Sequence, residues 1–418
     1  MPVDAASVES AASRLRGVVT TTPLEPNARL SARTGAQVWL KREDLQVVRS
    51  YKVRGAYNLI AQLAGADHAA GVVCASAGNH GQGVAHACAL LGVPGRVHVP
   101  RTTPRQKRDR IAALGGPAVT TIVAGDTYDD AAAGALADAA ATGATLVPAF
   151  DDPRTIAGQG TVAAEVVAQF TAATGAPPDV LVVPVGGGGL LAGCLAWLRE
   201  RHPGVRLVGV EPAGAACMAA AVAAGGPVRL EHIDGFVDGA AVRRAGDATY
   251  RVVAAGGAEL AVVPEGAACA EMLALYQTDG IIAEPAGALA PAALGGAVPV
   301  APGESVVCVL SGGNNDVSRY AEVVERALVH EGRKHYFLVE FPQEPGALRR
   351  FLDEVLGPDD DITLFEYVKR SNRETGPALV GVELARADDL GPLLARMAAA
   401  PPAVERVDPA SPLFRYLL

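Results

Sequence analysis

Short apolar segments alternate with longer helical patterns along the first three quarters of the chain, and this alternation limits the folds that the sequence can adopt. The apolar segments are rich in Val, Leu and Ile and have the length of buried strands. They are Val72–Ala75, Arg96–Val99, Val119–Val123, Thr145–Ala149, Val180–Val185, Leu207–Val210 and Ser305–Leu310. The helical patterns between them are Ala77–Leu91, Pro104–Leu114, Tyr128–Ala141, Thr155–Thr174 and Leu190–Arg201. This order predicts an α/β fold with parallel sheets that are covered by helices on both faces.

The pattern changes after Arg333, where charged and aromatic residues become frequent. A chain of 418 residues is also too long for one ordinary core. Strand-like runs at Lys334–Phe341, Asp361–Lys369 and Ala378–Leu384 combine with helical patterns at Gly346–Leu356 and Asp388–Ala398 in a β-α-β-β-α-β order of ferredoxin-like type. We therefore predict a large domain over residues 1–330, with a smaller subdomain inserted at about 50–150, and a second domain over 333–418. A helix over Val317–Val329 is expected to connect them, and Ala213–Gly226 is expected to form a helix pair.

Charge and cysteine usage exclude several classes of partner. The net charge is −9 and the Lys and Arg residues are spread along the chain, so there is no electrostatic footprint for nucleic acid or for an anionic membrane. The six cysteines occur singly, without the spacing of a zinc site, and are typical of small core residues in a reducing compartment. We therefore expect no metal site and small metabolites as partners.

A cytoplasmic location is expected, because the first residues include Asp4 and Glu9 and lack the basic and apolar regions of a secretory signal. Val180–Leu198 is uncharged and long enough for a membrane span. Pro184 and four consecutive glycines interrupt it, however, which favours a strand, a loop and a helix.

Lys52 lies in the sequence SYKVRGA, where an extended segment gives way to a helical pattern. A lysine at a helix start is close to the positive end of the helix dipole, and burial there would also disfavour its charged form. Both effects favour a neutral amine that can attack an aldehyde and later accept a proton from a substrate carbon. The alternative is an ordinary solvated lysine.

Four glycines, Gly186, Gly187, Gly188 and Gly189, follow the apolar run LVVPV and precede a helix that begins near Leu190. Backbone N–H groups in such a turn can bind a phosphate dianion without a basic side chain. A flexible linker is the alternative. A nucleotide site also stays open for this loop, since Glu211 follows the next strand, although neither a Walker motif nor a clear GxGxxG motif is present.

Two further motifs also follow predicted strands. In SAGNHGQG, Asn79 offers an amide to a phenolic oxygen, and the N–H groups of Ser76, Ala77, Gly78, Asn79 and His80 could hold a substrate carboxylate. A helix cap is the alternative for Asn79, and helix packing is favoured over metal binding for His80 and His86.

In SGGN, Ser311 could place a hydroxyl against a ring nitrogen, or it could simply form a turn. Glu284 before Pro285 is typical of a helix start, with a place beside a cofactor ring as a second interpretation.

Taken together, these motifs supply what pyridoxal 5'-phosphate requires: an amine for a Schiff base, converging N–H groups for the phosphate, and hydrogen-bond partners for the phenolate and the ring nitrogen. A hydroxyl partner leaves the ring nitrogen largely neutral, which favours elimination over transamination. Three of the four motifs follow the carboxyl ends of predicted strands, where ligands bind in open α/β sheets.

In this order of motifs the chain resembles the threonine dehydratases, also called threonine ammonia-lyases, of the fold-type-II pyridoxal phosphate enzymes. The resemblance is carried by KREDLQVVRSYKVRGA, SAGNHGQG, GGGGL and SGGN, and by KHYFLVEFPQEPGALRRFL and DDITLFEYVKR near the carboxyl terminus. It implies a tryptophan-synthase-β-like fold of two parallel-sheet α/β subdomains, followed by a ferredoxin-like, ACT-like regulatory domain.

The resemblance also implies residue roles. Lys52 would be the catalytic residue, and the cofactor would be bound by Lys52, Asn79, Gly186, Gly187, Gly188, Gly189, Leu190 and Ser311. The implied reaction is that of a carbon–nitrogen lyase of isoleucine biosynthesis, which converts L-threonine to 2-oxobutanoate and ammonia and accepts L-serine as a secondary substrate. Isoleucine, and in some cases valine, would act as allosteric effector of a homotetramer.

Other functions stay open at this point. Serine dehydratase and serine racemase share the lysine, asparagine and glycine motifs but generally lack a regulatory extension of this kind. A non-catalytic amino-acid sensor could keep the cofactor scaffold without turnover. A nucleotide-binding regulator would leave Lys52 and Ser311 unexplained.

Overall fold

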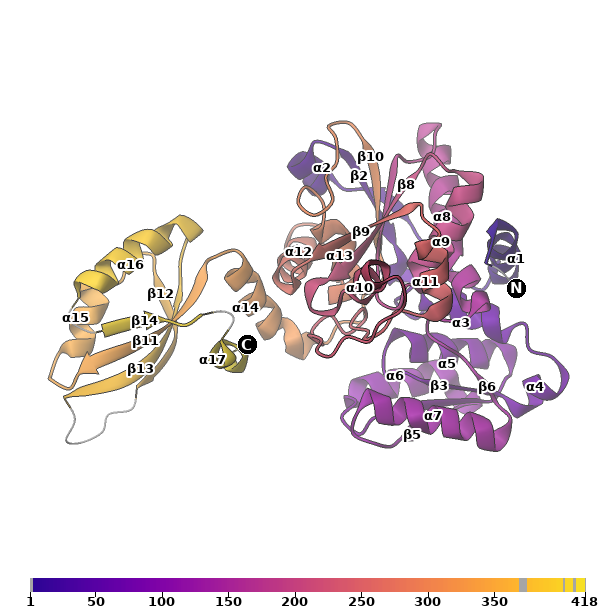
Figure 1. The fold of residues 1–418 in the computed structure, drawn as a ribbon, viewed down its shortest axis with the longest axis horizontal. Coiled ribbons are helices and arrows are strands. Elements are labelled where there is room, and N and C mark those ends of the chain that lie inside the picture. Colours follow the sequence, from indigo (N-terminus) through magenta and orange to yellow (C-terminus); the bar gives the residue numbers. More distant parts are fainter. Residues whose placement is uncertain (1–2, 368–373, 401–402, 409–410, 418) are drawn as a thin grey trace. The chain divides into compact units, whose positions relative to one another are not determined.

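The computed structural model describes residues 3–367, 374–400, 403–408 and 411–417. The chain divides into two compact units, residues 1–315 and 316–418 (Figure 1). The division places the helix that follows Asn315 with the second unit.

The first unit contains a six-stranded sheet in the order β1-β2-β10-β7-β8-β9. Its strands are β1 (Leu24–Pro26), β2 (Gln37–Arg42), β7 (Val180–Pro184), β8 (Arg206–Pro212), β9 (Ala258–Val263) and β10 (Ser305–Leu310). Only the edge strand β1 pairs antiparallel, and the other pairings are parallel. The predictions for β7, β8 and β10 are confirmed, whereas β1, β2 and β9 were not predicted.

A second, four-stranded sheet of the first unit has the order β5-β4-β3-β6, and all its pairings are parallel. Its strands are β3 (Val72–Ala75), β4 (Gly95–Val99), β5 (Val119–Val123) and β6 (Thr145–Leu146). The predicted parallel sheets are therefore confirmed, although β6 has two residues rather than the five expected. It pairs only with the first two residues of β3.

Helices cover these sheets and contribute the other side of each core. They are α1 (Ala5–Leu15), α2 (Ala28–Thr34), α3 (Lys52–Ile60), α4 (Gly65–Ala70), α5 (Asn79–Leu91), α6 (Arg105–Gly115), α7 (Tyr128–Thr142), α8 (Pro153–Thr174), α9 (Gly189–Arg201), α10 (Cys217–Ala224), α11 (Asp247–Ala254), α12 (Glu265–Gln277) and α13 (Pro285–Ala292). The predicted helix pair at 213–226 is wrong: a 3-10 turn at Ala213–Ala215 precedes the single helix α10, which ends at Gly225 with φ of 72°.

The longest helix, α8, has the end signals that its sequence predicts. The Asp152 side chain accepts a hydrogen bond from the N–H of Arg154, and Pro153 occupies the first turn, where its missing N–H costs nothing. Gly175 ends the helix with φ of 89°, a conformation that glycine adopts without strain.

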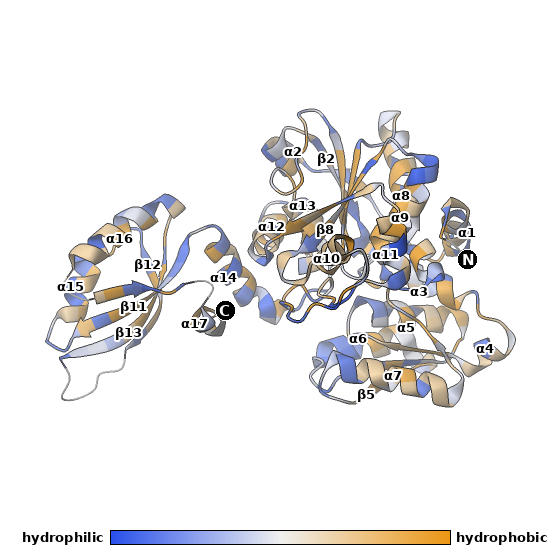
Figure 2. Cartoon of the chain, in the orientation of Figure 1, coloured by the Kyte–Doolittle hydropathy of each residue, from blue (hydrophilic) through white to orange (hydrophobic). Residues whose placement is uncertain are grey.

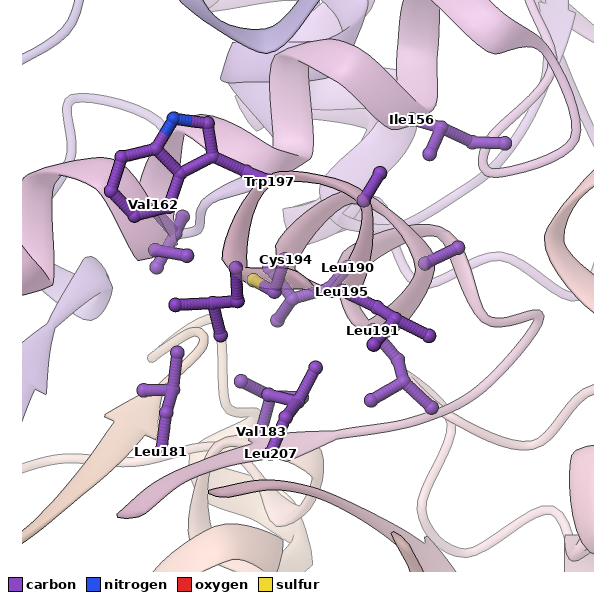
Figure 3. Close-up of a cluster of buried hydrophobic side chains, with 14 of the residues drawn as sticks. Ile156, Val162, Leu181, Val183, Leu190, Leu191, Cys194, Leu195, Trp197 and Leu207 are labelled. Carbon is purple, nitrogen blue, oxygen red and sulfur yellow. The ribbon is translucent and has the colours of Figure 1, made fainter. Parts of the chain in front are cut away.

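Helix α9 is apolar on every side from Gly189 to Leu198, and this part lies inside the core of the first unit. Figure 3 shows Leu191, Cys194 and Leu195 of α9 above Val183 and Leu207 of the sheet. A helix of this composition is stable only when other elements cover all its faces. The buried position of α9 fixes the glycine loop at its amino-terminal end. Hydrophobic residues concentrate along the strands and on the inner helices of both sheets (Figure 2).

No helix in the described part of the chain has both the length and the hydropathy that a membrane crossing requires. The apolar stretch Val180–Leu198 is divided between strand β7 and helix α9.

The second unit begins with a 3-10 turn at Val317–Arg319 and helix α14 (Tyr320–His330), close to the predicted helix. It continues with β11 (Lys334–Pro342), α15 (Ala347–Glu354), β12 (Asp361–Tyr367), β13 (Thr375–Glu383), α16 (Leu390–Ala399), β14 (Ala403–Arg406) and α17 (Pro412–Leu417). Its antiparallel sheet has the order β12-β13-β11-β14, which confirms the ferredoxin-like order. The second predicted strand run, Asp361–Lys369, ends in residues 368–369, which lie outside the described residues.

Candidate active site

Lys52 is the first residue of α3 and its side chain is partly buried. Its Nζ donates a hydrogen bond to the carbonyl oxygen of Ala149 at 3.2 Å. Burial lowers the pKa of the Lys52 ammonium to about 8, although the nearby Glu284 carboxylate acts in the opposite direction. The side chain is therefore an amine with an accessible neutral form, as the sequence predicted for this position.

The segment before Lys52 pairs with the SGGN motif. Ser50 and Gly312 form an antiparallel bridge, and the N–H of Tyr51 donates to the carbonyl of Ser311 at 3.1 Å. The N–H of Gly313 donates to the carbonyl of Arg49 at 2.9 Å. These backbone contacts bring together the Lys52 motif and the SGGN motif, which lie far apart in the sequence.

Ser311 is buried at the end of β10, and its hydroxyl donates to the carbonyl of Ala286 at 3.4 Å. This long hydrogen bond is the only one that its side chain makes within the described residues. The hydroxyl is therefore weakly held and can turn toward another acceptor or donor.

Asn79 begins α5 and connects two other residues. Its Nδ2 donates to Glu284 Oε1 at 2.6 Å, and its Oδ1 accepts from Asn314 Nδ2 at 2.7 Å. The backbone N–H of Glu284 in turn donates to the carbonyl of Gly312 at 3.1 Å. Asn79, Glu284 and the SGGN motif therefore form one hydrogen-bonded group.

Burial, together with the negative charge of Asp238, raises the pKa of the Glu284 carboxyl to about 7, against the opposing hydrogen bond from Asn79. The carboxyl is therefore poised between its neutral and charged forms near neutral pH. The structure supports the second interpretation of Glu284, a residue beside the site, in addition to its place as the residue before α13.

The glycine loop presents a row of unpaired backbone donors. Among the hydrogen bonds of the described residues, none has as its donor a backbone N–H between Gly186 and Leu191. The carbonyl groups of the same loop are paired: Gly186 accepts from the Cys217 thiol at 3.4 Å and Gly187 from the Thr249 hydroxyl at 2.7 Å. A loop with bound carbonyls and free N–H groups at a helix start is a ready anion site.

The loop before α5 is the second place with free donors at a helix start. The N–H of Gly78 donates to the Ser76 hydroxyl at 3.2 Å, whereas the N–H groups of Ala77, Asn79 and His80 have no acceptor within the described chain. These groups suit a carboxylate, as predicted.

His80 is buried and its Nε2 is 2.8 Å from the carbonyl of Val147, while its Nδ1 has no partner among the described residues. Burial, together with the charge of Lys52, lowers the pKa of His80 to about 4, so the imidazole is neutral at physiological pH. Nowhere in the described residues do three His, Cys, Asp or Glu side chains cluster as metal ligands.

The connection between β6 and α8 contains two residues that sequence reasoning missed. Ala149 accepts the Lys52 hydrogen bond, the ring of Phe150 packs directly on Gly187, and the Cβ and backbone of Phe150 pack on Gly189. A Cβ atom at Gly187 would lie 2.4 Å from the ring, so only glycine fits there. The lysine and the glycine loop are therefore linked through two consecutive residues.

The arrangement fits pyridoxal phosphate on the residues present. The free N–H groups of Gly186–Leu191 match a phosphate dianion, and the Lys52 amine matches the aldehyde. Asn314, whose Nδ2 also donates to the carbonyl of Val48 at 2.8 Å, is a further residue of the site that the sequence analysis did not assign a role. Its position as the last residue of the SGGN motif was the only available signal.

Comparisons with known proteins agree with this geometry. Residues 15–312 match the family model described as pyridoxal-phosphate dependent enzyme, and residues 325–417 match the C-terminal regulatory domain of threonine dehydratase. The biosynthetic L-threonine dehydratase IlvA of Mycobacterium tuberculosis is 64% identical over 99% of this chain and 96% of its own.

Solved structures give the same result. The processed form of threonine deaminase isoform 2 from Solanum lycopersicum has a TM-score of 0.71 and 34% identity, covering 78% of this chain and 96% of its own. Maize serine racemase has a TM-score of 0.70 and 28% identity, covering 79% of this chain and 99% of its own. The chain belongs to the pyridoxal-phosphate-dependent enzymes of fold type II, in the threonine dehydratase family with its C-terminal regulatory domain.

Proposed function

We propose that this chain is a biosynthetic L-threonine dehydratase, which converts L-threonine to 2-oxobutanoate and ammonia and accepts L-serine as a secondary substrate. The observation that carries the proposal is the connection of the Lys52 amine to the unpaired N–H groups of the glycine loop through Ala149 and Phe150. This connection lies in a chain that is 64% identical over nearly its full length to a threonine dehydratase.

Different residues of the chain carry out different steps of the reaction. When bound, pyridoxal phosphate withdraws electrons from the substrate α-carbon and so acidifies its proton. Lys52 Nζ takes that α-proton, because its lowered pKa of about 8 gives access to a neutral, basic amine near neutral pH. The free N–H groups of Ala77, Asn79 and His80 hold the substrate carboxylate, and Asn79 and Ser311 orient the cofactor ring.

The β-hydroxyl takes up one proton and leaves as water, which balances the α-proton that Lys52 accepts, and an enamine remains. It tautomerises to an imine and takes up one water to release ammonia and the 2-oxo acid. Water is therefore lost once and regained once, and the overall reaction is an elimination followed by hydrolysis.

The regulatory domain match at 325–417 distinguishes the proposal from serine dehydratase and serine racemase. Formation of 2-oxobutanoate from L-threonine by the purified chain tests it. We expect threonine to give 2-oxobutanoate and ammonia in equal amounts. Racemisation of serine, without formation of 2-oxobutanoate from threonine or of pyruvate from serine, would contradict the proposal and would favour the racemase.

The pH dependence of cofactor attachment tests the place of Lys52. Only a neutral amine attacks the aldehyde, so covalent attachment of pyridoxal phosphate to the cofactor-free chain should speed up as pH rises through about 8 and level off above it. Stopped-flow absorbance at a series of pH values gives this profile. A rate that keeps rising to pH 10 would show an ordinary lysine pKa and would contradict the buried position of the amine.

Isoleucine is the proposed effector of the second unit, with valine as a further candidate, in a cytoplasmic homotetramer. Helix α15 begins after Pro345-Gly346, where its first N–H groups can meet an amino-acid carboxylate. The six cysteines are all free and buried, as in a reducing compartment.

The regulation is tested by threonine titrations with and without isoleucine. A coupling free energy of about 1–3 kcal/mol would raise the half-saturating threonine concentration roughly 5- to 150-fold. Superimposable curves would remove isoleucine from the proposal. The same titrations with valine show whether it opposes or reproduces the effect.

A further inference from the structure

We infer that Thr249 is a positioning residue for phosphate binding, which acts by turning the peptide groups of the glycine loop. The inference rests on the proposed assignment of Gly186–Leu190 as the phosphate site. Thr249 is fully buried, and its hydroxyl donates to the carbonyl of Gly187 at 2.7 Å. A second acceptor, the carbonyl of Gly246, is 3.1 Å from the same hydroxyl, so the shorter bond goes to the loop.

The direction of a carbonyl determines the direction of the next N–H group. In a trans peptide the C=O and the following N–H point to opposite sides. The Thr249 hydroxyl holds the Gly187 carbonyl on the side of α11, so the N–H of Gly188 points to the other side. The Cys217 thiol holds the Gly186 carbonyl at 3.4 Å in the same manner, which orients the N–H of Gly187.

Thr249 is itself fixed by its helix. The two carboxylate oxygens of Asp151 accept hydrogen bonds from the N–H groups of Asp247 and Ala248 at 3.0 and 2.7 Å, at the start of α11. The N–H of Gly246 is a second, longer donor to the Gly187 carbonyl, at 3.3 Å. Without the hydroxyl, this weak bond alone would hold that carbonyl.

The loop is also confined on both faces. Phe150 packs on Gly187 and Gly189, and Thr249 and Met218 pack on Gly188, where a Cβ atom would lie 3.0 Å from Thr249 Cβ. Gly188 has φ of 93°, a conformation that favours glycine. The loop therefore has little room to turn as a whole. Within it, the Thr249 hydroxyl fixes the orientation of the peptide group between Gly187 and Gly188.

The test compares pyridoxal 5'-phosphate with pyridoxal, which has the same aldehyde and ring but no phosphate. Dissociation constants for both are measured on the full-length chain after its cofactor has been removed. The ratio of the dissociation constant of pyridoxal to that of pyridoxal 5'-phosphate measures how much the phosphate contributes to binding. Effects on folding and on attachment at Lys52 change both constants and cancel in this ratio. We expect Thr249→Val to reduce this ratio about tenfold, the equivalent of one hydrogen bond, while pyridoxal affinity stays within about twofold.

Two variants serve as controls, one for a change in side-chain shape at position 249 and one for the loss of a buried hydroxyl elsewhere. Thr249→Ser keeps the hydroxyl and should keep the ratio of the unmodified chain. Thr155→Val removes a hydroxyl that is equally buried but donates to the carbonyl of Pro148 at 3.2 Å, outside the loop, and it should also keep the ratio.

Gly188→Ala separates this inference from the proposed function. If Gly188→Ala reduces the ratio and Thr249→Val does not, the positioning role of Thr249 is wrong and the phosphate site stands. If neither variant changes the ratio, the assignment of the loop as the phosphate site is wrong, and the inference fails with it.

Discussion

Replacement of Lys52 by alanine is expected to abolish both covalent cofactor attachment and threonine turnover. Lys52 is the residue whose amine lies at a helix start, is partly buried, and is linked through Ala149 and Phe150 to the glycine loop. Loss of a covalent nucleophile that also serves as the base should lower kcat by at least about 1,000-fold, because both roles depend on one atom.

Two variants show whether the effect belongs to that amine. Lys52→Arg keeps a positive charge but offers no nucleophilic amine, so it should be as inactive as Lys52→Ala. Lys107→Ala removes the amine of a partly exposed lysine that pairs with Asp238 at 2.9 Å, and this variant should retain the covalent cofactor. Substantial turnover in Lys52→Ala would exclude the proposed mechanism.

The second large effect is expected from Arg54→Met, which should destabilise the first unit by about 3–5 kcal/mol, the range for breaking a buried ion pair on one side. Arg54 is 1% exposed and its guanidinium pairs with Glu43 at 2.7 Å and Glu165 at 2.9 Å. The Lys41 ammonium binds the other oxygen of Glu165. The variant leaves Glu43, fully buried, without its main cation.

Chemical denaturation followed by tryptophan fluorescence measures this effect, because both tryptophans, Trp39 and Trp197, lie in the first unit. Arg105→Met is the matched control, since Arg105 pairs with Asp109 on the surface with 86% of its side chain exposed. It should leave the free energy of unfolding nearly unchanged. Equal losses of unfolding free energy in the two variants would show that the buried ion pairs of Arg54 stabilise the fold no more than a surface ion pair does.

The same network has a pH signature. Burial by itself would raise the pKa of Glu43, but the charge and hydrogen bonds of Arg54 lower it overall. A carboxyl with a lowered pKa stabilises the fold above its unfolded pKa of about 4.3, and this contribution is lost as pH falls through the folded value.

Much of the fold could be predicted from the sequence because its elements have strong local signals. Buried parallel strands form continuous apolar runs, so β3, β5 and β10 were predicted at the residues where they occur. The strands that were missed lack this signal. Strand β2 contains Lys41 and Arg42, and the burial of Lys41 depends on Glu165, which lies 124 residues further along the chain.

The alanine-rich segment at 213–226 shows a different limit. Alanine has high helix propensity but gives no apolar periodicity, so the number of helices could not be read from the pattern. The Glu211 side chain accepts hydrogen bonds from the N–H groups of Met218 and Ala219 and so fixes the start of the single helix.

The residues of the candidate site could be predicted where a short local motif is enough to indicate a role. Lys52, Asn79, the glycine loop and Ser311 each follow a helix or strand boundary that the sequence reveals. Phe150, Thr249 and Asn314 were missed, because their importance comes from contacts with distant residues, such as Gly187 for Phe150 and Thr249. Such pairs are a property of the tertiary fold and leave no local pattern.

The most direct test of the account is to locate the covalent attachment point of the cofactor. The purified chain, saturated with pyridoxal phosphate, is treated with borohydride, digested and analysed by mass spectrometry. We expect a phosphopyridoxyl adduct on the peptide that contains Lys52, and no such adduct when threonine has displaced the lysine before reduction. An adduct on another lysine, or none at all, would contradict the assignment of Lys52.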